Sequence, residues 1–425
     1  MQRTLTHALP TVSAGDRVRI EGWVHRRRRL GGIAFLIIRD RTGLAQAVVT
    51  DDDARRIDEL VEETVVAVEG TVAANGKAPG GVELIDPQIT ELSPPAVAPP
   101  VELWRPSSEV SLPLLLDHAP VLWRHPAQNA LWRIATASLR GFRTTLDRHG
   151  FIEIQTPKIV GSATESGANV FRLDYFGRPA YLAQSPQLYK QMMVGVFERV
   201  YETGPVFRAE PHDTARHLAE YVSLDVEFGF IRDHRDVLAM LREVLAGMLD
   251  EVAANAALPG VQALPAVPDE IPVIHFRDAL ALVDADPDEP DLAPEHERRL
   301  GEWARVEHGS EFLAVEGYPA IKRPFYTHPA PDDARWTNSF DVLFRGLELC
   351  TGGQRLHAAD AYEQALASRG ESTADYEAYL QTFRHGMPPH GGFAIGLERW
   401  VARLTGTDNI RRTALFPRDL NRLSP

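Results

Sequence analysis

Two stretches decide the fold: Phe207-Arg208-Ala209-Glu210, which continues to Arg216-His217-Leu218-Ala219-Glu220-Tyr221, and Gly392-Phe393-Ala394-Ile395-Gly396-Leu397-Glu398-Arg399. Each sets an arginine close to a carboxylate. We predict a strand for the first and a glycine-containing strand end that enters a helix for the second. Arginine can bind phosphate oxygens through two bonds, and neighbouring acids can hold the Mg²⁺ that neutralises the same phosphates. The two stretches therefore indicate a polyphosphate site, although an ordinary surface ion pair would explain either one alone.

The composition is that of a globular protein with more than one domain. The chain has 425 residues, of which 44% are hydrophobic and 24% charged, and this length fits two or three domains. The net charge of −14 argues against a protein that coats nucleic acid without selectivity, because such binding needs a broad basic surface. The one cysteine, Cys350, excludes an internal disulfide and suits a reducing compartment. Since no apolar stretch has the length of a signal peptide or a membrane span, we expect a cytoplasmic protein.

The order of strand and helix patterns predicts two domains. Residues 17–92 contain five short strand patterns with an acidic helix after the third, which is typical of an OB-fold β-barrel; another small barrel is the alternative. We place this domain at residues 1–95. A proline-rich run then breaks helix and sheet, so residues 96–125 are expected to form a linker. Residues 126–425 predict an α+β domain built on an antiparallel sheet flanked by helices, with a small peripheral insertion at about 255–315.

A basic cluster in the first domain is a candidate nucleic-acid site. The run His25-Arg26-Arg27-Arg28-Arg29 precedes Phe35, which lies on the next predicted strand. Single-stranded nucleic acid is often held by cations on its phosphates and by an aromatic ring under a splayed base. Gln46 could then read a base edge. A solvated basic loop with Phe35 in the barrel core is the alternative.

The second domain offers candidates for substrate binding. A loop of small residues, 162–167, carries one acid, Glu165, which could close on a substrate and pair with an α-ammonium group. Further on, a serine–proline pair predicts the start of a helix that places Gln187 and Lys190 on one face. An ordinary surface lysine is the alternative for Lys190.

Two acids near the end of the domain are candidate metal ligands. Asp341 and Glu348 precede a Gly-Gly turn and Arg355. Mg²⁺ needs only one or two protein carboxylates, keeps some of its waters and binds phosphates, so this set suits it. A pair of unrelated surface acids is the alternative.

These motifs together resemble those of the class II aminoacyl-tRNA synthetases. The two stretches quoted first are similar to the second and third signature motifs of that family. The predicted helix from Pro126, with the strand that stops at Pro157, resembles the first motif, which forms the dimer interface there. Gln184-Ser185-Pro186-Gln187-Leu188-Tyr189-Lys190-Gln191 and the loop with Glu165 resemble the aspartyl-tRNA synthetases, and residues 25–46 are similar to their anticodon-binding barrel. The short insertion is similar to that of the archaeal and eukaryotic type.

The resemblance implies an enzyme that uses ATP and Mg²⁺ to join L-aspartate to tRNA(Asp) through an aspartyl-adenylate, and that works as a homodimer. It implies catalytic roles for Arg208, Glu348 and Arg399, and magnesium binding by Asp341, Glu348 and Thr351. The implied aspartate-binding residues are Glu165, Gln187, Lys190, Arg208, Thr351 and Arg355. The implied ATP-binding residues are Arg208, Ala209, Glu210, Arg216, His217, Leu218, Glu348, Gly396, Leu397, Glu398 and Arg399. The implied anticodon-binding residues are His25, Arg28, Phe35, Gln46 and Pro79.

Three residues bear on specificity within this family. The lysine at the place of Lys190 pairs with the side-chain carboxylate of aspartate, whereas bound asparagine would leave a buried lysine unpaired, so Lys190 favours aspartate. His25 and Pro79 are similar to the residues of enzymes that accept both the aspartate and the asparagine anticodon. This likeness implies charging of tRNA(Asn) as well, and an amidotransferase that acts on the product. An asparaginyl-tRNA synthetase, a strict aspartyl enzyme and a catalytically inactive RNA-binding relative are the alternatives.

Overall fold

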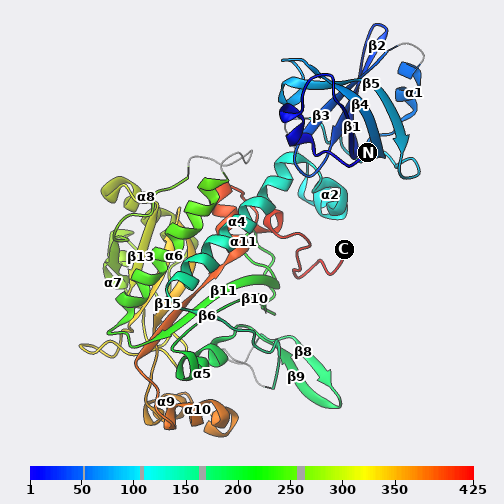
Figure 1. The fold of residues 1–425 in the computed structure, drawn as a ribbon. Coiled ribbons are helices and arrows are strands. Elements are labelled where there is room, and N and C mark those ends of the chain that lie inside the picture. Colours follow the sequence, from blue (N-terminus) through cyan, green and yellow to red (C-terminus); the bar gives the residue numbers. More distant parts are fainter. Residues whose placement is uncertain (51–52, 106–109, 162–168, 256–263) are drawn as a thin grey trace. The chain divides into compact units, whose positions relative to one another are not determined.

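The structure is a computed structural model that describes residues 1–50, 53–105, 110–161, 169–255 and 264–425. Within these ranges the chain folds as two compact units, Met1–Asn129 and Ala130–Pro425 (Figure 1). In the same ranges no helix has both the length and the apolar character that crossing a membrane requires.

The first unit is built around a closed barrel with the strand order β1-β2-β3-β5-β4. The strands are β1 (Arg17–Leu30), β2 (Ile33–Arg39), β3 (Leu44–Thr50), β4 (Val65–Ala74) and β5 (Val82–Glu91), with short 3-10 turns at Thr6–Thr11 and Pro79–Gly81. Helix α1 (Asp53–Glu59) follows β3. Alternate residues such as Ile20, Leu36 and Val68 fill the barrel interior, as the period of two in the strand patterns requires. The predicted OB-fold is confirmed.

The segment that the sequence assigns to a linker, residues 96–125, belongs to this first unit. It contains the short helices α2 (Leu112–Asp117) and α3 (Ala119–Leu122). The guanidinium of Arg26 lies 3.6 Å from the ring centre of Trp104, a cation–π contact that joins the segment to β1.

The second unit is an eight-stranded sheet in the order β12-β13-β14-β15-β16-β11-β10-β6. The strands are β6 (Ile152–Glu153), β10 (Arg199–Phe207), β11 (Glu220–Gly229), β12 (Val273–His275), β13 (Phe312–Glu316), β14 (Ser339–Phe344), β15 (Leu347–Gln354) and β16 (His390–Gly396). The six central strands pair antiparallel, as predicted. The two edge pairs, β12 with β13 and β6 with β10, are parallel, so the sheet is mixed rather than purely antiparallel.

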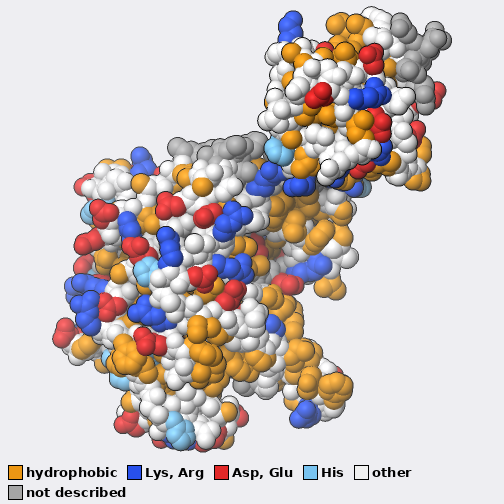
Figure 2. Space-filling view, in the orientation of Figure 1, with side chains coloured by type: hydrophobic (Ala, Val, Ile, Leu, Met, Phe, Trp, Pro, Cys, Tyr) orange, Lys and Arg blue, Asp and Glu red, His pale blue; other side chains and the backbone are white. Residues whose placement is uncertain are grey.

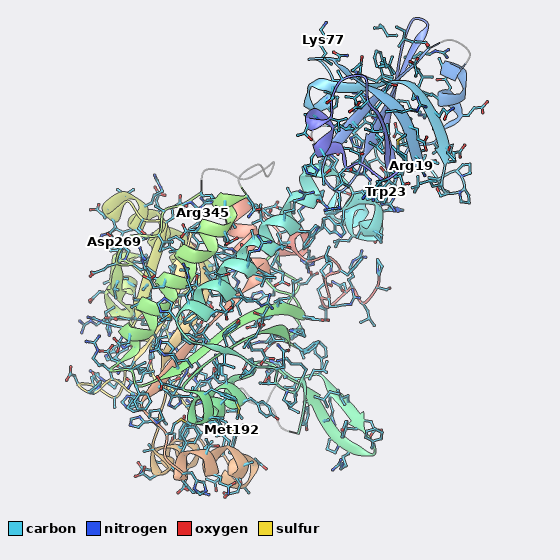
Figure 3. All side chains as sticks on the ribbon, in the orientation of Figure 1. Arg19, Trp23, Lys77, Met192, Asp269 and Arg345 are labelled. Carbon is cyan, nitrogen blue, oxygen red and sulfur yellow. The ribbon has the colours of Figure 1, made fainter. Side chains whose placement is uncertain are left out.

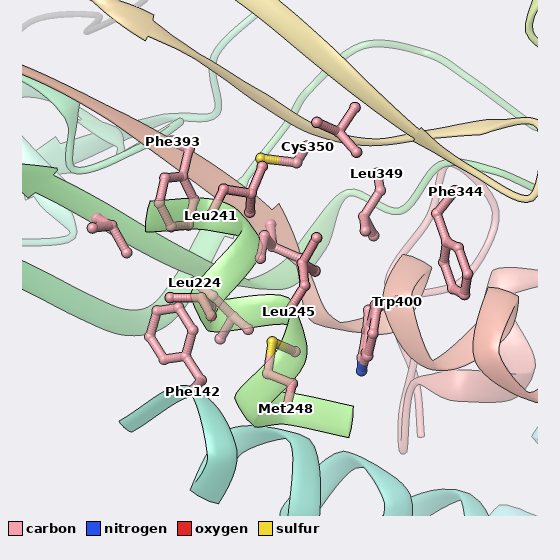
Figure 4. Packing of buried hydrophobic residues seen from close by; sticks show 14 of the residues in the cluster. Phe142, Leu224, Leu241, Leu245, Met248, Phe344, Leu349, Cys350, Phe393 and Trp400 are labelled. Carbon is pink, nitrogen blue, oxygen red and sulfur yellow. The ribbon is translucent and has the colours of Figure 1, made fainter. Parts of the chain in front are cut away.

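One side of this sheet is covered by helices that form the main core. The helices are α4 (Pro126–Arg148), α6 (His234–Ala254) and α11 (Leu397–Thr405). Figure 4 shows Phe142, Leu241 and Leu245 from the helices packed with Leu224 and Phe393 from the sheet. Because this side is apolar, the opposite side of β11, β15 and β16 is left for polar chemistry.

Smaller elements surround the sheet. They are β7 (Ile159–Val160), β8 (Arg172–Tyr175), β9 (Arg178–Leu182), α5 (Gln187–Phe197), α7 (Phe276–Leu282), α8 (Pro294–His308), α9 (Ala359–Ser368), α10 (Glu377–Arg384) and two 3-10 turns, Thr373–Tyr376 and Ile410–Thr413. The hairpin β8–β9 ends in exposed aromatic side chains, with Phe176 88% exposed, and appears as a hydrophobic tip in Figure 2. The predicted insertion is only partly peripheral, since β12 and β13 extend the sheet.

Two local strand predictions are wrong. Arg208 to Glu210 is not part of a strand, because β10 ends at Phe207 and β11 begins at Glu220. The residues between them contain Pro211 and several polar side chains, which favour a loop over a sheet ladder. The strand expected at 150–157 shortens to β6.

Candidate active site

A cavity of about 480 Å³ lies on the polar side of the central sheet in the second unit. Its wall is formed by α5, the β10–β11 loop, β11, β15, β16 and the start of α11. Most of the predicted substrate-binding residues line it: Gln187, Lys190, Arg208, Glu210, Arg216, His217, Leu218, Glu348, Thr351, Arg355, Gly396, Glu398 and Arg399. The fold therefore brings together residues that lie far apart in the sequence, from Gln187 to Arg399.

Three of the predicted residues that the structure describes are not on the wall. Ala209 lies between the lining residues Arg208 and Glu210. Leu397 is buried in the main core. Asp341 is buried next to the lining residue Arg323, with 2.9 Å between Oδ1 and Nη2. Glu165 lies outside the described residues.

One end of the cavity holds a buried cluster of opposite charges. Lys190 Nζ lies 3.0 Å from Asp225 Oδ1 and 3.3 Å from Glu227 Oε2. The guanidinium of Arg355 donates to Glu227 Oε1 at 2.9 Å. Burial alone would raise the pKa of the Glu227 carboxyl, but the charges of Arg355 and Lys190 outweigh it and hold the pKa below its usual value. Lys190 and Arg355 line the cavity and are held in place by the ionised Glu227. This arrangement suits the binding of a carboxylate.

The two acids of this cluster belong to strand β11, and a glycine of the neighbouring strand β16 makes room for one of them. Asp225 and Glu227 alternate with the core residues Leu224 and Val226, so their side chains all point to the polar side. A Cβ atom at Gly392 would lie 2.2 Å from Glu227 Oε2 and 2.0 Å from the Val226 carbonyl oxygen. The close approach of β16 to Glu227 thus requires glycine.

The other end of the cavity is rich in arginine. Arg399 donates to the Glu348 carbonyl oxygen at 2.7 Å and lies 3.6 Å from the Glu348 carboxylate. Arg216 is held by Glu297 of α8, with 2.9 Å between Nη2 and Oε1. Burial and the charge of Arg399 lower the pKa of His217 to about 4, so its ring is neutral near pH 7. Such a set of fixed cations fits a polyphosphate.

Asp341 of β14 and Glu348 of the neighbouring strand β15 are two acids that influence each other. Burial raises the pKa of Asp341 to about 6, and the neighbouring Glu348 adds to this against the charge of Arg323. The charges of Arg399 and Arg323 overcome the burial of Glu348 and lower its pKa. Thr351 Oγ1 donates to Glu348 Oε1 at 3.3 Å.

This acidic pair fits a magnesium ion that is shared with a phosphate ligand. Asp341 Oδ1 is buried, and its contact with Arg323 Nη2 at 2.9 Å is an ion pair. No group of three or more His, Cys, Asp or Glu side chains that could hold a metal occurs in the described ranges. Two carboxylates with a hydroxyl are nevertheless enough for Mg²⁺, which takes its remaining oxygens from water and phosphate.

Sequence reasoning missed several residues of the site. Asp225 and Glu227 carried a signal, since they are acids at alternate positions of a predicted strand. Arg323 carried none, because it lies in a long irregular segment. Glu297 was assigned to a peripheral insertion, yet it binds Arg216 and accepts the Glu348 backbone N–H at 3.0 Å.

The buried acid Glu398 predicts a pH effect on stability. Burial raises its pKa from the usual 4.5 to about 7, although both carboxylate oxygens accept the Val222 N–H at 3.1 Å. Because the folded-state pKa is the higher one, the stabilisation is full below pH 4.5 and is lost as the pH rises through 7. Glu398→Gln keeps the acceptor and should remove this loss, which amounts to about 3 kcal/mol. Denaturant unfolding of the wild type and the variant at pH 5 and pH 8 tests this prediction. If the free energy of unfolding falls equally between the two pH values in both proteins, the prediction is wrong.

The first unit carries a separate polar surface on β1, β2 and β3, in which Phe35 is half-buried and Gln46 is only 3% exposed. Arg28 and Phe35 are paired across β1 and β2, with the guanidinium 5.4 Å from the ring centre. Arg28 Nη2 donates to Gln46 Oε1 at 3.2 Å, and Gln46 Nε2 donates to Glu83 at 2.9 Å. The structure thus brings together three of the five residues predicted to bind an anticodon.

The other two occupy different environments. His25 is only 5% exposed and lies at an irregularity of β1, with its Nδ1 3.4 Å from the Arg39 guanidinium. Burial, followed by the charge of Arg39, lowers its pKa to about 4. Pro79 begins the 3-10 turn before β5 and is half-buried.

Each of the two units matches a known protein family. Residues 113–420 match the family model of tRNA synthetases class II (D, K and N), and residues 18–92 match that of the OB-fold nucleic acid binding domain. The chain is 44% identical to the aspartate–tRNA(Asp/Asn) ligase of Thermus thermophilus over 97% of each chain. It is 43% identical to the enzyme of the same name from Deinococcus radiodurans, over 100% of this chain and 99% of that one.

Solved structures give the same result. The asparaginyl-tRNA synthetase from Pyrococcus horikoshii complexed with asparaginyl-adenylate matches with a TM-score of 0.92 at 32% identity, over the full length of both chains. The aspartyl tRNA synthetase from Entamoeba histolytica matches with a TM-score of 0.86 at 28% identity, over 100% of this chain and 93% of that one. With an arginine-rich cavity on its mixed sheet and a barrel before it in the sequence, the chain belongs to the family of class II tRNA synthetases (D, K and N).

Proposed function

We propose that the chain ligates L-aspartate to tRNA in two steps, with residues 126–425 as the catalytic part and residues 1–95 as the anticodon-binding part. The observation that carries the proposal is the Lys190–Glu227–Arg355 cluster, which presents two buried cations to the cavity next to its arginine-rich end. An amino acid with a side-chain carboxylate would fit the end formed by Lys190 and Arg355, and ATP would fit the arginine-rich end. The names of the Thermus and Deinococcus relatives support it.

The chemistry needs no nucleophile from the protein. The α-carboxylate of aspartate attacks the α-phosphorus of ATP, the aspartyl-adenylate forms and pyrophosphate leaves. A ribose hydroxyl at the tRNA 3′ end then attacks the activated carbonyl carbon and releases AMP. Arg208 would bridge the reacting carboxylate and α-phosphate, while Arg399 and Arg216 would bind the outer phosphates. Glu210, His217 and the backbone around Gly396 would enclose the nucleotide.

Aspartate, rather than asparagine, is the substrate we propose. Lys190 and Arg355 already face Asp225 and Glu227, and a substrate carboxylate would add a charge-assisted bond to both cations, whereas a neutral amide would not. Asparagine is the second candidate, favoured by the likeness to the Pyrococcus asparaginyl enzyme. Pyrophosphate exchange with each amino acid in turn decides between them, since exchange with asparagine alone would reject the proposal.

We propose Asp341, Glu348 and Thr351 as the residues that hold Mg²⁺ with ATP. The ion would neutralise phosphate charge when bound. Asp341→Asn keeps the shape of the side chain but removes one anionic ligand, so it should raise the Mg²⁺ concentration for half-maximal pyrophosphate exchange about tenfold. A magnesium titration of the exchange rate measures this shift, and an unchanged midpoint would remove Asp341 from the ligand set.

The surface formed by Arg28, Phe35 and Gln46 is proposed to bind the anticodon. Phe35→Ala removes a stacking platform, so kcat/KM for aminoacylation should fall about tenfold or more. Pyrophosphate exchange without tRNA should be unchanged, because it takes place in the other unit. Parallel assays of the two activities test this, and equal losses in both would indicate damage to the fold instead.

The proposed tRNA specificity includes tRNA(Asn) as well as tRNA(Asp). It rests on the names of the Asp/Asn relatives and on the residues His25 and Pro79. Since His25 is buried, any effect of this residue would act through the shape of the barrel next to Arg39. Charging of separate tRNA(Asp) and tRNA(Asn) transcripts with labelled aspartate tests it, and charging of tRNA(Asp) alone would restrict the function. The proposal extends to a cytoplasmic homodimer whose Asp-tRNA(Asn) feeds an amidotransferase.

A further inference from the structure

A buried chain of hydrogen bonds lies behind the amino-acid end of the cavity. It joins Gln187 and Gln191 of α5 to Tyr362 of α9, Tyr379 of α10 and His390 of β16. All five side chains are at most 4% exposed. Figure 3 labels Met192, the next residue of α5, where this helix packs against α9 and α10. None of the roles proposed above uses Gln191, Tyr362, Tyr379 or His390.

The direction of this chain is fixed at the end formed by His390. Its Nδ1 lies 3.0 Å from the Pro388 carbonyl oxygen, which can only accept, so Nδ1 carries a proton. Burial lowers the pKa of His390 to about 4, so the ring is neutral near pH 7 and Nε2 is an acceptor. The atom of Gln191 that lies 2.9 Å from Nε2 must therefore be the amide nitrogen.

Tyr362 fixes the same end of Gln191 independently. Its hydroxyl donates to the Leu356 carbonyl oxygen at 2.7 Å, which uses its one proton. The hydroxyl oxygen can then only accept from Gln191 Nε2, which lies at 3.0 Å. Two acceptors thus face the amide nitrogen of Gln191, and its carbonyl oxygen must point the other way.

The orientation of Gln191 determines that of Gln187. Gln191 Oε1 accepts from the Tyr379 hydroxyl at 3.0 Å and from Gln187 Nε2 at 3.1 Å. The amide nitrogen of Gln187 is therefore turned toward Gln191. Because Gln187 lines the cavity, its carbonyl oxygen is the end of the amide left for a substrate.

We propose that Gln191, fixed by His390 and Tyr362, is a positioning residue that makes Gln187 present a hydrogen-bond acceptor to the α-ammonium group of the amino acid. This inference rests on the proposed function. The ammonium group is the only hydrogen-bond donor of ionised aspartate, so an acceptor selects it over either carboxylate. A reversed Gln187 would turn two N–H groups toward that cation instead.

A double-mutant cycle tests the inference through aspartate-dependent pyrophosphate exchange. Gln187→Met and Gln191→Met should each raise the KM for aspartate about tenfold, and the double variant should be no worse than either one. The KM for ATP should stay within about twofold. Gln191→Glu should keep the KM for aspartate near the wild-type value, because a protonated carboxyl group can donate toward His390 Nε2 or the Tyr362 hydroxyl and still offers an acceptor to Gln187.

The control variant is Leu366→Ala, which opens a cavity in the same α9–α10 cluster and leaves the five polar side chains chemically unchanged. It should lower the Tm while leaving both KM values unchanged. The inference is wrong if the KM increases of Gln187→Met and Gln191→Met multiply in the double variant. It is also wrong if Leu366→Ala raises the KM for aspartate as much as these variants do. If Gln191→Met does not fold, Gln191→Glu provides the test. A KM for aspartate in Gln191→Glu as high as that in Gln187→Met would also overturn the inference. Absence of aspartate-dependent exchange in the wild type would instead refute the proposed function.

Discussion

Lys190→Met is expected to lower kcat/KM for aspartate about a thousandfold and to reduce the free energy of unfolding by about 3–5 kcal/mol. The substitution removes a buried cation that lies 3.0 Å from Asp225 and 3.3 Å from Glu227. One carboxylate would then be left without compensation, and the substrate carboxylate would lose one of its two partners. Pyrophosphate exchange measures the first effect and denaturant unfolding the second.

Lys158→Met supplies a matched control for this prediction. Lys158 Nζ lies 2.7 Å from Glu202, an acid that is as deeply buried as those beside Lys190, but it does not line the cavity. We expect a comparable loss of stability with no change in the KM for aspartate. If both lysine variants lose activity equally, the role of Lys190 in binding aspartate is wrong.

Arg208→Lys is expected to lower the rate of adenylate formation at least about a hundredfold. Arg208 lies at the start of the β10–β11 loop and lines the cavity. Lysine keeps the charge but cannot bridge two oxygens in a plane, so the loss should fall on kcat more than on either KM. Single-turnover formation of labelled adenylate measures it. Arg178→Lys on β9, outside the cavity, should have no effect, and a wild-type rate in Arg208→Lys would exclude a bridging role.

Much of the fold could be predicted because it follows from local alternation. The five strand patterns of the first domain all become barrel strands. The strand predicted for residues 207–210 is wrong beyond Phe207, where β10 ends. Whether such a segment continues a ladder depends on which residues pair, and Phe207 with Glu220 is the last pair here. The sequence of either segment alone does not determine this pairing.

The candidate site was less predictable, because its contacts are long-range. Residues that belong to quoted motifs, such as Lys190 and Arg399, line the cavity as expected. Glu297 and His390 could not be assigned, since the first contacts Arg216 across 81 positions and the second contacts Gln191 across 199. The burial of His25 was equally hidden, because a histidine in a basic run gives no sign of which side of the strand it faces.

The glycine under Glu227 sets a limit on how this pocket can evolve. Every other amino acid adds at least one carbon atom at position 392, and that atom would overlap the Glu227 carboxylate and the β11 backbone. No substitution at position 392 therefore leaves Glu227 in place. A change of amino-acid preference over generations would have to come from side chains that line the cavity, such as Lys190 and Arg355, while position 392 stays the same.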